Sequence, residues 1–424
     1  LFFYPPRLTP SEYKDISKTM LLPDAKVEYR KSTPHGFVEI VSSPVLRYAP
    51  GVSLAYRDSF PVRKVVFNNG NWMGCLLPQP LEANETNILD YTPQALPYHI
   101  DNIKNALIIN AGTGENVLLA LSHQVARITA NETNPEIFNI LRQSFEGFYQ
   151  VQPYQTMPRT LLTPDTNKYD LIELPIVGSF FGNSGLNAVE PRYELTIEAL
   201  REMWNKLSEK GMISLSCWMD YPVRNAYRLL ATISLLLDEN DIAHPLHHVV
   251  AIRSWCAITF LVKKSPFKRD EINKVRLFCE HRMFDPLVLP EKQEIERDKY
   301  NILQDTTFFT HIDQLLSHEK ETLIRQYPYR IHPTTDDRPF FFQFVRFKQI
   351  PQLISSIREK NFPFLDIGYV LIILTFVQIV FIAAIFILLP LSFRPWKSRN
   401  KKWVLMYFSG LGVAYMFLEM VFIQ

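Results

Sequence analysis

The sequence predicts an α/β fold, in which a parallel sheet with helices follows a small β unit and precedes two long apolar helices. Strand and helix patterns alternate from residue 105 onward, and this alternation is typical of a parallel α/β sheet. Residues 1–100 are instead rich in β-forming and turn residues, and the chain becomes mostly apolar after residue 366. We therefore expect five regions, with bounds 1–100, 101–265, 266–366, 367–393 and 403–424.

The first region has short strand patterns at 27–30, 36–41 and 65–72. The last of these contains Asn69-Gly70, a dipeptide that favours a tight hairpin turn. We expect a small β-rich unit over residues 1–100.

The second region supplies the main sheet. Its strands are predicted at 105–110, 126–131, 169–173, 211–218 and 254–262, with a further strand over 244–252 beside the last one. Helices are predicted at 117–125, 135–148 and 192–207, the last ending before Glu209-Lys210-Gly211. Residues 266–366 are predicted as a mixed α/β extension.

A glycine-containing turn joins the first strand of this sheet to its helix, as Asn110-Ala-Gly112-Thr-Gly114. Glycine lets the backbone approach a ligand closely, and the N-terminus of the following helix offers free N–H groups. Glu132 stands 18 residues after Gly114, at the end of the next strand. An acid at that point of a Rossmann-like domain accepts the ribose hydroxyls of an adenosine-containing ligand. We assign cofactor binding to Asn110, Gly112, Gly114 and Glu132.

Two apolar runs end the chain. The first has no charged residue from Ile367 to Phe393, and its 22-residue core would span roughly 30 Å as a helix. The second starts at Trp403 and contains Glu419. We expect both to cross a membrane, with the second one truncated, and a multi-pass protein of a bacterial inner membrane in contact with lipid. Basic loops tend to face the cytoplasm, so the basic loop 394–402 would place the soluble domain, one crossing earlier, on the outside. A cofactor made in the cytosol favours the opposite orientation, with the soluble domain in the cytosol.

Charge and cysteine content exclude other classes of protein. The formal net charge is only +2, and no basic cluster precedes the apolar runs, so we expect no nucleic-acid partner. The four cysteines form no CxxC pair, so neither a zinc site nor a disulfide framework is expected. His247 and His248 face opposite ways on a predicted strand. We therefore assign no metal-binding residues.

Several segments together resemble the spermidine synthase-like, membrane-embedded branch of the class I S-adenosylmethionine-dependent methyltransferase superfamily. They are the stretches 29–41, 43–54, 110–121, 169–172, 196–201, 336–342 and 417–424. The resemblance implies a class I methyltransferase sheet and S-adenosylmethionine, or its decarboxylated form, as cofactor. A small-molecule acceptor and a homodimer are the other partners we expect.

The chain also departs from that family. Asn110 stands where aminopropyltransferases have the first glycine of the turn, and Glu173-Leu174-Pro175 replaces the region of their proton-accepting acid. Met157-Pro158 stands where an acid usually contacts the adenine. Because open α/β sheets bind ligands at the carboxyl ends of their strands, Glu173 is the candidate catalytic base. The alternative is that Glu173 is a carboxylate at the sheet edge without a catalytic role. Asp336-Asp337-Arg338 is assigned a structural role.

Three functions remain open at this point. The first is a membrane-anchored methyltransferase or spermidine synthase-like transferase. The second is a non-catalytic Rossmann module that regulates or scaffolds a membrane assembly. The third is a transporter with a nucleoside-sensing domain and Glu419 in its path.

Overall fold

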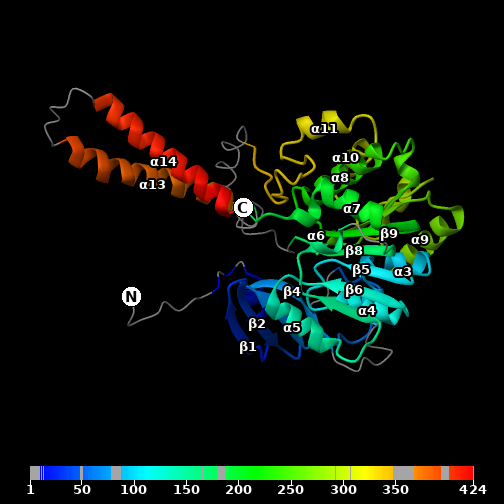
Figure 1. The fold of residues 1–424 in the computed structure, drawn as a ribbon. Coiled ribbons are helices and arrows are strands. Elements are labelled where there is room, and N and C mark those ends of the chain that lie inside the picture. The colour runs from blue at the N-terminus through cyan, green and yellow to red at the C-terminus, as the bar shows by residue number, and fades with distance from the viewer. Residues whose placement is uncertain are drawn as a thin grey trace. The chain divides into compact units, whose positions relative to one another are not determined.

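The computed structural model describes most of the 424-residue chain. The described residues are 10, 12, 14–47, 51–77, 87–163, 167–178, 188, 190–291, 293–305, 307–346, 367–392 and 401–423. The chain divides into two compact units, Leu1–Tyr369 and Val370–Gln424 (Figure 1).

The N-terminal part of the first unit is a four-stranded antiparallel sheet in the order β1-β2-β3-β4. The short helix α1 (Asp15–Thr19) precedes the strands β1 (Lys26–Thr33), β2 (Gly36–Ser42), β3 (Lys64–Asn68) and β4 (Asn71–Leu76). Asn69 and Gly70 join β3 to β4 with φ angles of 52° and 75°. Two successive left-handed residues are what a tight hairpin turn requires, so the predicted turn is confirmed.

The main sheet has eight strands in the order β12-β10-β11-β9-β8-β5-β6-β7. The strands β7, β6, β5, β8 and β9 are parallel, whereas β11 runs antiparallel to both of its neighbours. The strands expected over 244–252 and 254–262 are therefore neighbours in the sheet, as β10 and β11. The strands are β5 (Asn105–Ile108), β6 (Arg127–Asn131), β7 (Val151–Tyr154), β8 (Tyr169–Val177), β9 (Leu207–Trp218), β10 (Val249–Arg253), β11 (Ala257–Lys263) and β12 (Asp285–Val288).

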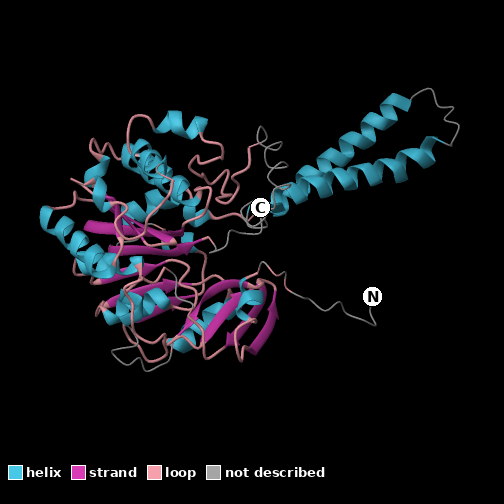
Figure 2. Cartoon of the chain, turned by 180° about the vertical axis from the view of Figure 1, so that it is seen from behind, coloured by secondary structure: helices cyan, strands magenta, loops and turns pink. Residues whose placement is uncertain are grey.

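Helices cover both faces of this sheet (Figure 2). One core cluster joins it to α7 (Ile197–Lys206), α8 (Asn225–Glu239), α10 (Thr307–Leu315) and α11 (Lys320–Gln326). The other core cluster joins it to α2 (Asn87–Asp90), α3 (Leu96–Ile100), α4 (Glu115–Ser122) and α9 (Arg269–Arg282).

Helix α5 (Pro135–Ser144) connects the two sheets. Its Ile137 packs with Val38 and Val66 of the small sheet, and Figure 1 shows α5 beside β2 and β4. The short helix α6 (Pro158–Leu161) follows β7.

Several predicted boundaries are wrong. The strand predicted over 244–252 is β10 (Val249–Arg253), and Pro245–His247 form a 3-10 helix before it, so His247 does not lie on a strand. Helix α7 begins at Ile197, because Thr196 caps it by accepting the backbone N–H of Ala199. Strand β9 begins at Leu207 and runs through the predicted helix stop at Gly211. The register between β8 and β9 shifts there, and a side chain at Gly211 would lie 2.7 Å from the carbonyl oxygen of Tyr169. Gly211 therefore allows the irregular pairing of β8 and β9, and it does not end a helix.

The segment around Asp336 is held by buried polar contacts. Arg228 of α8 donates to the backbone carbonyl oxygens of Arg330, Phe340, Phe341 and Gln343. Asp336 accepts from the Thr196 hydroxyl at 2.7 Å and from Arg159 at 3.1 Å. These contacts agree with the structural role assigned to this segment.

The second unit contains α13 (Ile367–Ser392) and α14 (Lys401–Ile423). Among the residues that the structure describes, no helix long and apolar enough to cross a membrane is found. The crossings expected over 367–393 and 403–424, and the multi-pass membrane location, are therefore not supported. The lipid partner stays a prediction. The Glu419 side chain lies outside the described residues.

Candidate functional site

The turn after β5 has the backbone that the sequence predicts. Asn110, Gly112 and Gly114 all adopt left-handed conformations, with φ angles of 54°, 56° and 95°. Glycine takes such angles without steric cost, and asparagine is the side chain that tolerates them best. Asn110 therefore adopts the left-handed conformation of this turn without being a glycine.

The turn is closely covered on two sides. A side chain at Gly114 would lie 2.3 Å from the Phe145 ring, and one at Gly112 would lie 3.0 Å from the carbonyl oxygen of Met73. Met73 belongs to β4, so the small sheet lies against the cofactor-type turn. Only glycine fits at Gly114, for reasons of both space and conformation.

Glu132 lies directly beside this turn, as predicted. Its carboxylate accepts the backbone N–H of Gly112 at 3.1 Å and that of Asn134 at 2.8 Å. Burial raises its pKa, although the backbone N–H groups of Asn134 and Gly112 act in the opposite direction. Glu132 thus joins the turn after β5 to the start of α5, and the structure brings all four predicted cofactor-binding residues to one edge of the sheet.

Asn131 is a polar residue of this edge that the sequence analysis did not single out. Its side chain is fully buried, accepts the backbone N–H of Asn110 at 2.9 Å and donates to the carbonyl oxygen of Thr156 at 2.8 Å. It therefore ties the turn to the loop after β7. Its position just before Glu132 was the one signal that pointed to it.

Glu194 and Arg192 approach the same turn from a distant part of the chain. Asn110 donates its side-chain N–H to Glu194 at 3.2 Å, and Arg192 lies 3.6 Å from the same carboxylate. Burial raises the pKa of Glu194, and the charge of Arg192 opposes this rise. Both residues precede α7, more than 70 residues after Asn110, and no local pattern marks them as part of the site.

Glu173, the predicted base, lies beneath the turn in the interior of β8. It pairs with Ile108 at the end of β5, while β8 continues to Val177. The carboxyl group is fully buried, and it accepts from Tyr98 at 3.0 Å and from Asn116 at 2.6 Å. Burial raises the pKa of Glu173 to about 8. The group is therefore largely protonated at neutral pH, and its catalytic role stays a prediction.

Trp218 and Asp220, at and just after the end of β9, make contacts within the chain. Asp220 caps α8 by accepting the backbone N–H groups of Arg224 and Asn225, and it also pairs with the Arg224 guanidinium at 3.0 Å. The Trp218 ring packs edge to face on Trp72. A cavity of about 740 Å³ is lined by residues between 142 and 153, among them Phe145, whose ring packs against Gly114 of the turn.

The four cysteines are free and buried.

Solved structures match this chain only at low sequence identity. No family model and no curated protein matches the chain. A spermidine synthase in complex with the transition-state analogue AdoDATO matches at 14% identity, over 68% of this chain and 87% of its own, with a TM-score of 0.41. A spermidine synthase from Thermotoga maritima matches at 15% identity over the same shares, with a TM-score of 0.40.

A probable spermidine synthase from Corynebacterium glutamicum also matches, at 14% identity, over 61% of this chain and 87% of its own, with a TM-score of 0.41. Likeness at this level concerns the fold only. The sheet order and the geometry at the turn therefore carry the functional argument.

Proposed function

We propose that the chain is a transferase of the methyltransferase or spermidine synthase-like type, which binds S-adenosylmethionine or its decarboxylated form at the turn after β5. The observation that carries the proposal is the Glu132 carboxylate beside Gly112, at the carboxyl edge of a sheet with the methyltransferase strand order. Ligands of open α/β sheets bind at that edge.

The polar groups around Glu132 fit an adenosine-containing ligand. An ionised carboxylate has about four acceptor positions, so Glu132 can accept two ribose hydroxyls in addition to its backbone donors. The Asn134 side-chain N–H is buried next to it and has no hydrogen-bond partner among the described residues. A buried donor without a partner costs about 1–3 kcal/mol, and a polar ligand atom would remove that cost.

Bound at this edge, the cofactor would supply a carbon activated by its sulfonium group to a small-molecule acceptor. The chain's own contribution is positioning: Glu132 orients the ribose, and the left-handed backbone of Gly112 leaves room for the ligand. Glu173 is the proposed base. It can accept a proton only when its carboxyl is ionised and reaches the acceptor, which requires it to leave Tyr98 and Asn116.

That requirement favours a second candidate, a non-catalytic module that binds the nucleoside and transfers nothing. Glu132, Glu173 and Glu194 all make hydrogen bonds within the chain. In this case the nucleoside would bind at the same edge, and no group would be transferred.

Calorimetric titration with S-adenosylmethionine, its decarboxylated form and S-adenosylhomocysteine tests the proposal. We expect micromolar binding by the wild type and a loss of at least tenfold in Glu132→Ala. The control Glu146→Ala changes an exposed acid after α5 and should bind normally. Absence of binding of all three compounds to the folded wild type would refute both candidates.

Transfer of a labelled methyl or aminopropyl group to a panel of amine and hydroxyl acceptors then separates the two. Turnover that Glu173→Gln lowers by 100-fold or more, with unchanged cofactor binding, supports the transferase. Binding without turnover supports the module. Turnover that Glu173→Gln leaves intact would show that another group accepts the proton.

A further inference from the structure

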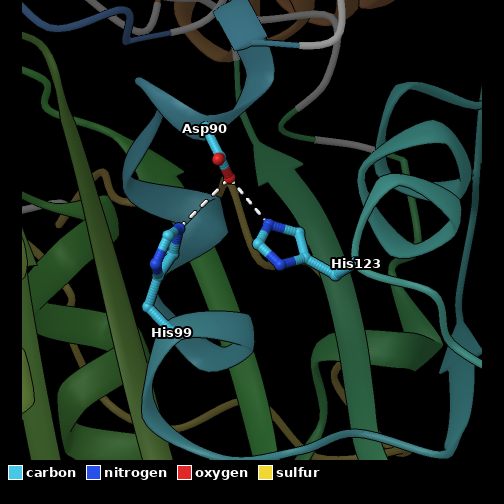
Figure 3. Close-up of side chains that lie close together, drawn as sticks. All are labelled: Asp90, His99 and His123. Atoms are coloured by element: carbon cyan, nitrogen blue, oxygen red, sulfur yellow. Dashed lines mark hydrogen bonds and ion pairs between the residues drawn. The ribbon is translucent and has the colours of Figure 1, made fainter. Parts of the chain in front are cut away.

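Asp90, His99 and His123 form a compact cluster on the face of the sheet that α3 and α4 cover (Figure 3). Asp90 is the last residue of α2, His99 lies in α3, and His123 directly follows α4. The Asp90 Oδ1 atom lies 3.2 Å from Nε2 of His99 and 2.7 Å from Nε2 of His123. All three ligand atoms lie within 4.8 Å of one another.

We propose that these three side chains bind one divalent transition-metal ion, of which Zn²⁺ fits best. Zinc bonds to imidazole nitrogen at about 2.0–2.1 Å and to carboxylate oxygen at about 2.0–2.2 Å, so neighbouring ligand atoms in a tetrahedral site lie roughly 3.3 Å apart. The spacing from Asp90 to His99, 3.2 Å, is close to that value, and the spacing to His123, 2.7 Å, is shorter. Imidazole with carboxylate is a ligand set that zinc commonly accepts.

The ligands are held in place by their surroundings. Arg282 lies 3.7 Å from the other carboxylate oxygen of Asp90 and donates to the Asp90 backbone carbonyl at 2.6 Å. It therefore orients the carboxylate so that Oδ1 faces the imidazoles. The Tyr98 ring stacks on His123 at 5.2 Å, and the Phe278 ring packs on His99 at 4.9 Å. Such contacts fix the ligand geometry before a metal binds.

The site leaves room for a fourth ligand. A cavity of about 260 Å³ is lined by both histidines, Tyr98 and Lys274. The three side chains are only 21–27% exposed, so solvent reaches the cluster without fully surrounding it. Three protein ligands with one open position are typical of zinc sites that bind water or a small anion.

The cluster is also connected to the proposed cofactor edge. Tyr98 stacks on His123 and donates its hydroxyl to Glu173 beneath the glycine turn. The metal site stands on its own contacts, however, and does not depend on the proposed function.

The experiment uses the full chain without an affinity tag, freed of metal with a chelator and titrated with ZnCl₂ against a chromophoric chelator. We expect one Zn²⁺ per chain with an affinity in the micromolar range or tighter. His99→Ala, His123→Ala and Asp90→Asn should each weaken binding at least 100-fold. Asp90→Asn keeps the shape of the side chain, so it tests the ligand even where an alanine variant fails to fold.

The matched control is His247→Ala. His244 and His247 also form a ring pair, at 5.9 Å, and neither belongs to the cluster, so this variant should bind Zn²⁺ like the wild type. Co²⁺ gives a second readout, because visible absorption bands of a four-coordinate site should appear in the wild type and vanish in Asp90→Asn. Absence of stoichiometric Zn²⁺ binding would overturn the proposal, and so would binding that the cluster variants leave unchanged. In either case the cluster would be a hydrogen-bonded ion pair only.

Discussion

Replacing Glu173 by glutamine removes one buried ionisable group and nearly preserves its shape. The Asn116 side chain can still donate to the amide oxygen, and the Tyr98 hydroxyl can accept from the amide nitrogen in place of donating. Because the geometry is retained, the main expected effect is on the pH dependence of stability.

The sign of this effect follows from the raised pKa. The pKa of Glu173 is about 8 in the folded chain, against an ordinary value of 4.5. Between these values the folded state binds more protons than the unfolded state, so the free energy of unfolding falls as pH rises. The stabilisation is complete below pH 4.5 and is lost by about pH 8.

The magnitude follows from the same two values. Each unit of pKa difference corresponds to about 1.4 kcal/mol, so linkage gives a loss of about 2 kcal/mol between pH 6 and pH 8. Glu115 is also buried, with its pKa raised to about 7, and it adds a similar slope. Because Glu115 is present in both proteins, its contribution cancels in the difference between wild type and Glu173→Gln.

Urea unfolding followed by tryptophan fluorescence at pH 5, 6, 7 and 8 measures this difference. Relative to the wild type, Glu173→Gln should gain about 2 kcal/mol in its free energy of unfolding between pH 6 and pH 8. The control Glu209→Gln changes an exposed acid of β9 and should keep a constant difference. A constant difference for Glu173→Gln as well would refute the reasoning, because Glu173 would then ionise as an exposed carboxyl does.

Two further predictions concern stability, each measured by urea unfolding. Gly114→Ala should lower the free energy of unfolding by about 3 kcal/mol or more, because it adds a clash with Phe145 to the strain of a left-handed alanine. The control Gly147→Ala, with φ of 91° and open space around it, should cost only the strain of about 1–2 kcal/mol. Equal losses in the two variants would show that the clash is absent. Arg228→Lys should lower the free energy of unfolding by about 2–4 kcal/mol, because one ammonium group cannot reach the four carbonyl oxygens that accept from the guanidinium. The control Arg201→Lys changes an exposed ion pair and should cost about 0.5 kcal/mol or less. A small loss in Arg228→Lys would show that solvent replaces those bonds.

Many strands and helices and the conformation of two turns were predictable from the sequence, whereas β7, β12, α8 and α9 were not singled out. The hairpin at Asn69-Gly70 and the turn at Gly112 and Gly114 depend on backbone angles that few residue types adopt. Buried strands such as β5 show as short apolar runs. These features are local, so a window of a few residues contains the information that determines them.

Glu132 was predictable for a related reason. In a strand–turn–helix–strand unit, the end of the second strand lies beside the glycine turn. This placement depends on the unit itself and not on the rest of the fold. The predicted role of Glu173 relied on the same rule, but the length of β8 beyond it and the contacts with Tyr98 and Asn116 were not visible in the local pattern.

The sequence by itself therefore determined the architecture of the α/β region and the cofactor-type turn. The tertiary structure alone decided that Glu194 reaches Asn110, that Glu173 is buried, and that Asp90 meets His99 and His123. These residues come from separate elements, and packing of the helices on the sheet brings their side chains together. Backbone propensities act over neighbouring residues, whereas a site assembled across the core depends on how whole elements pack.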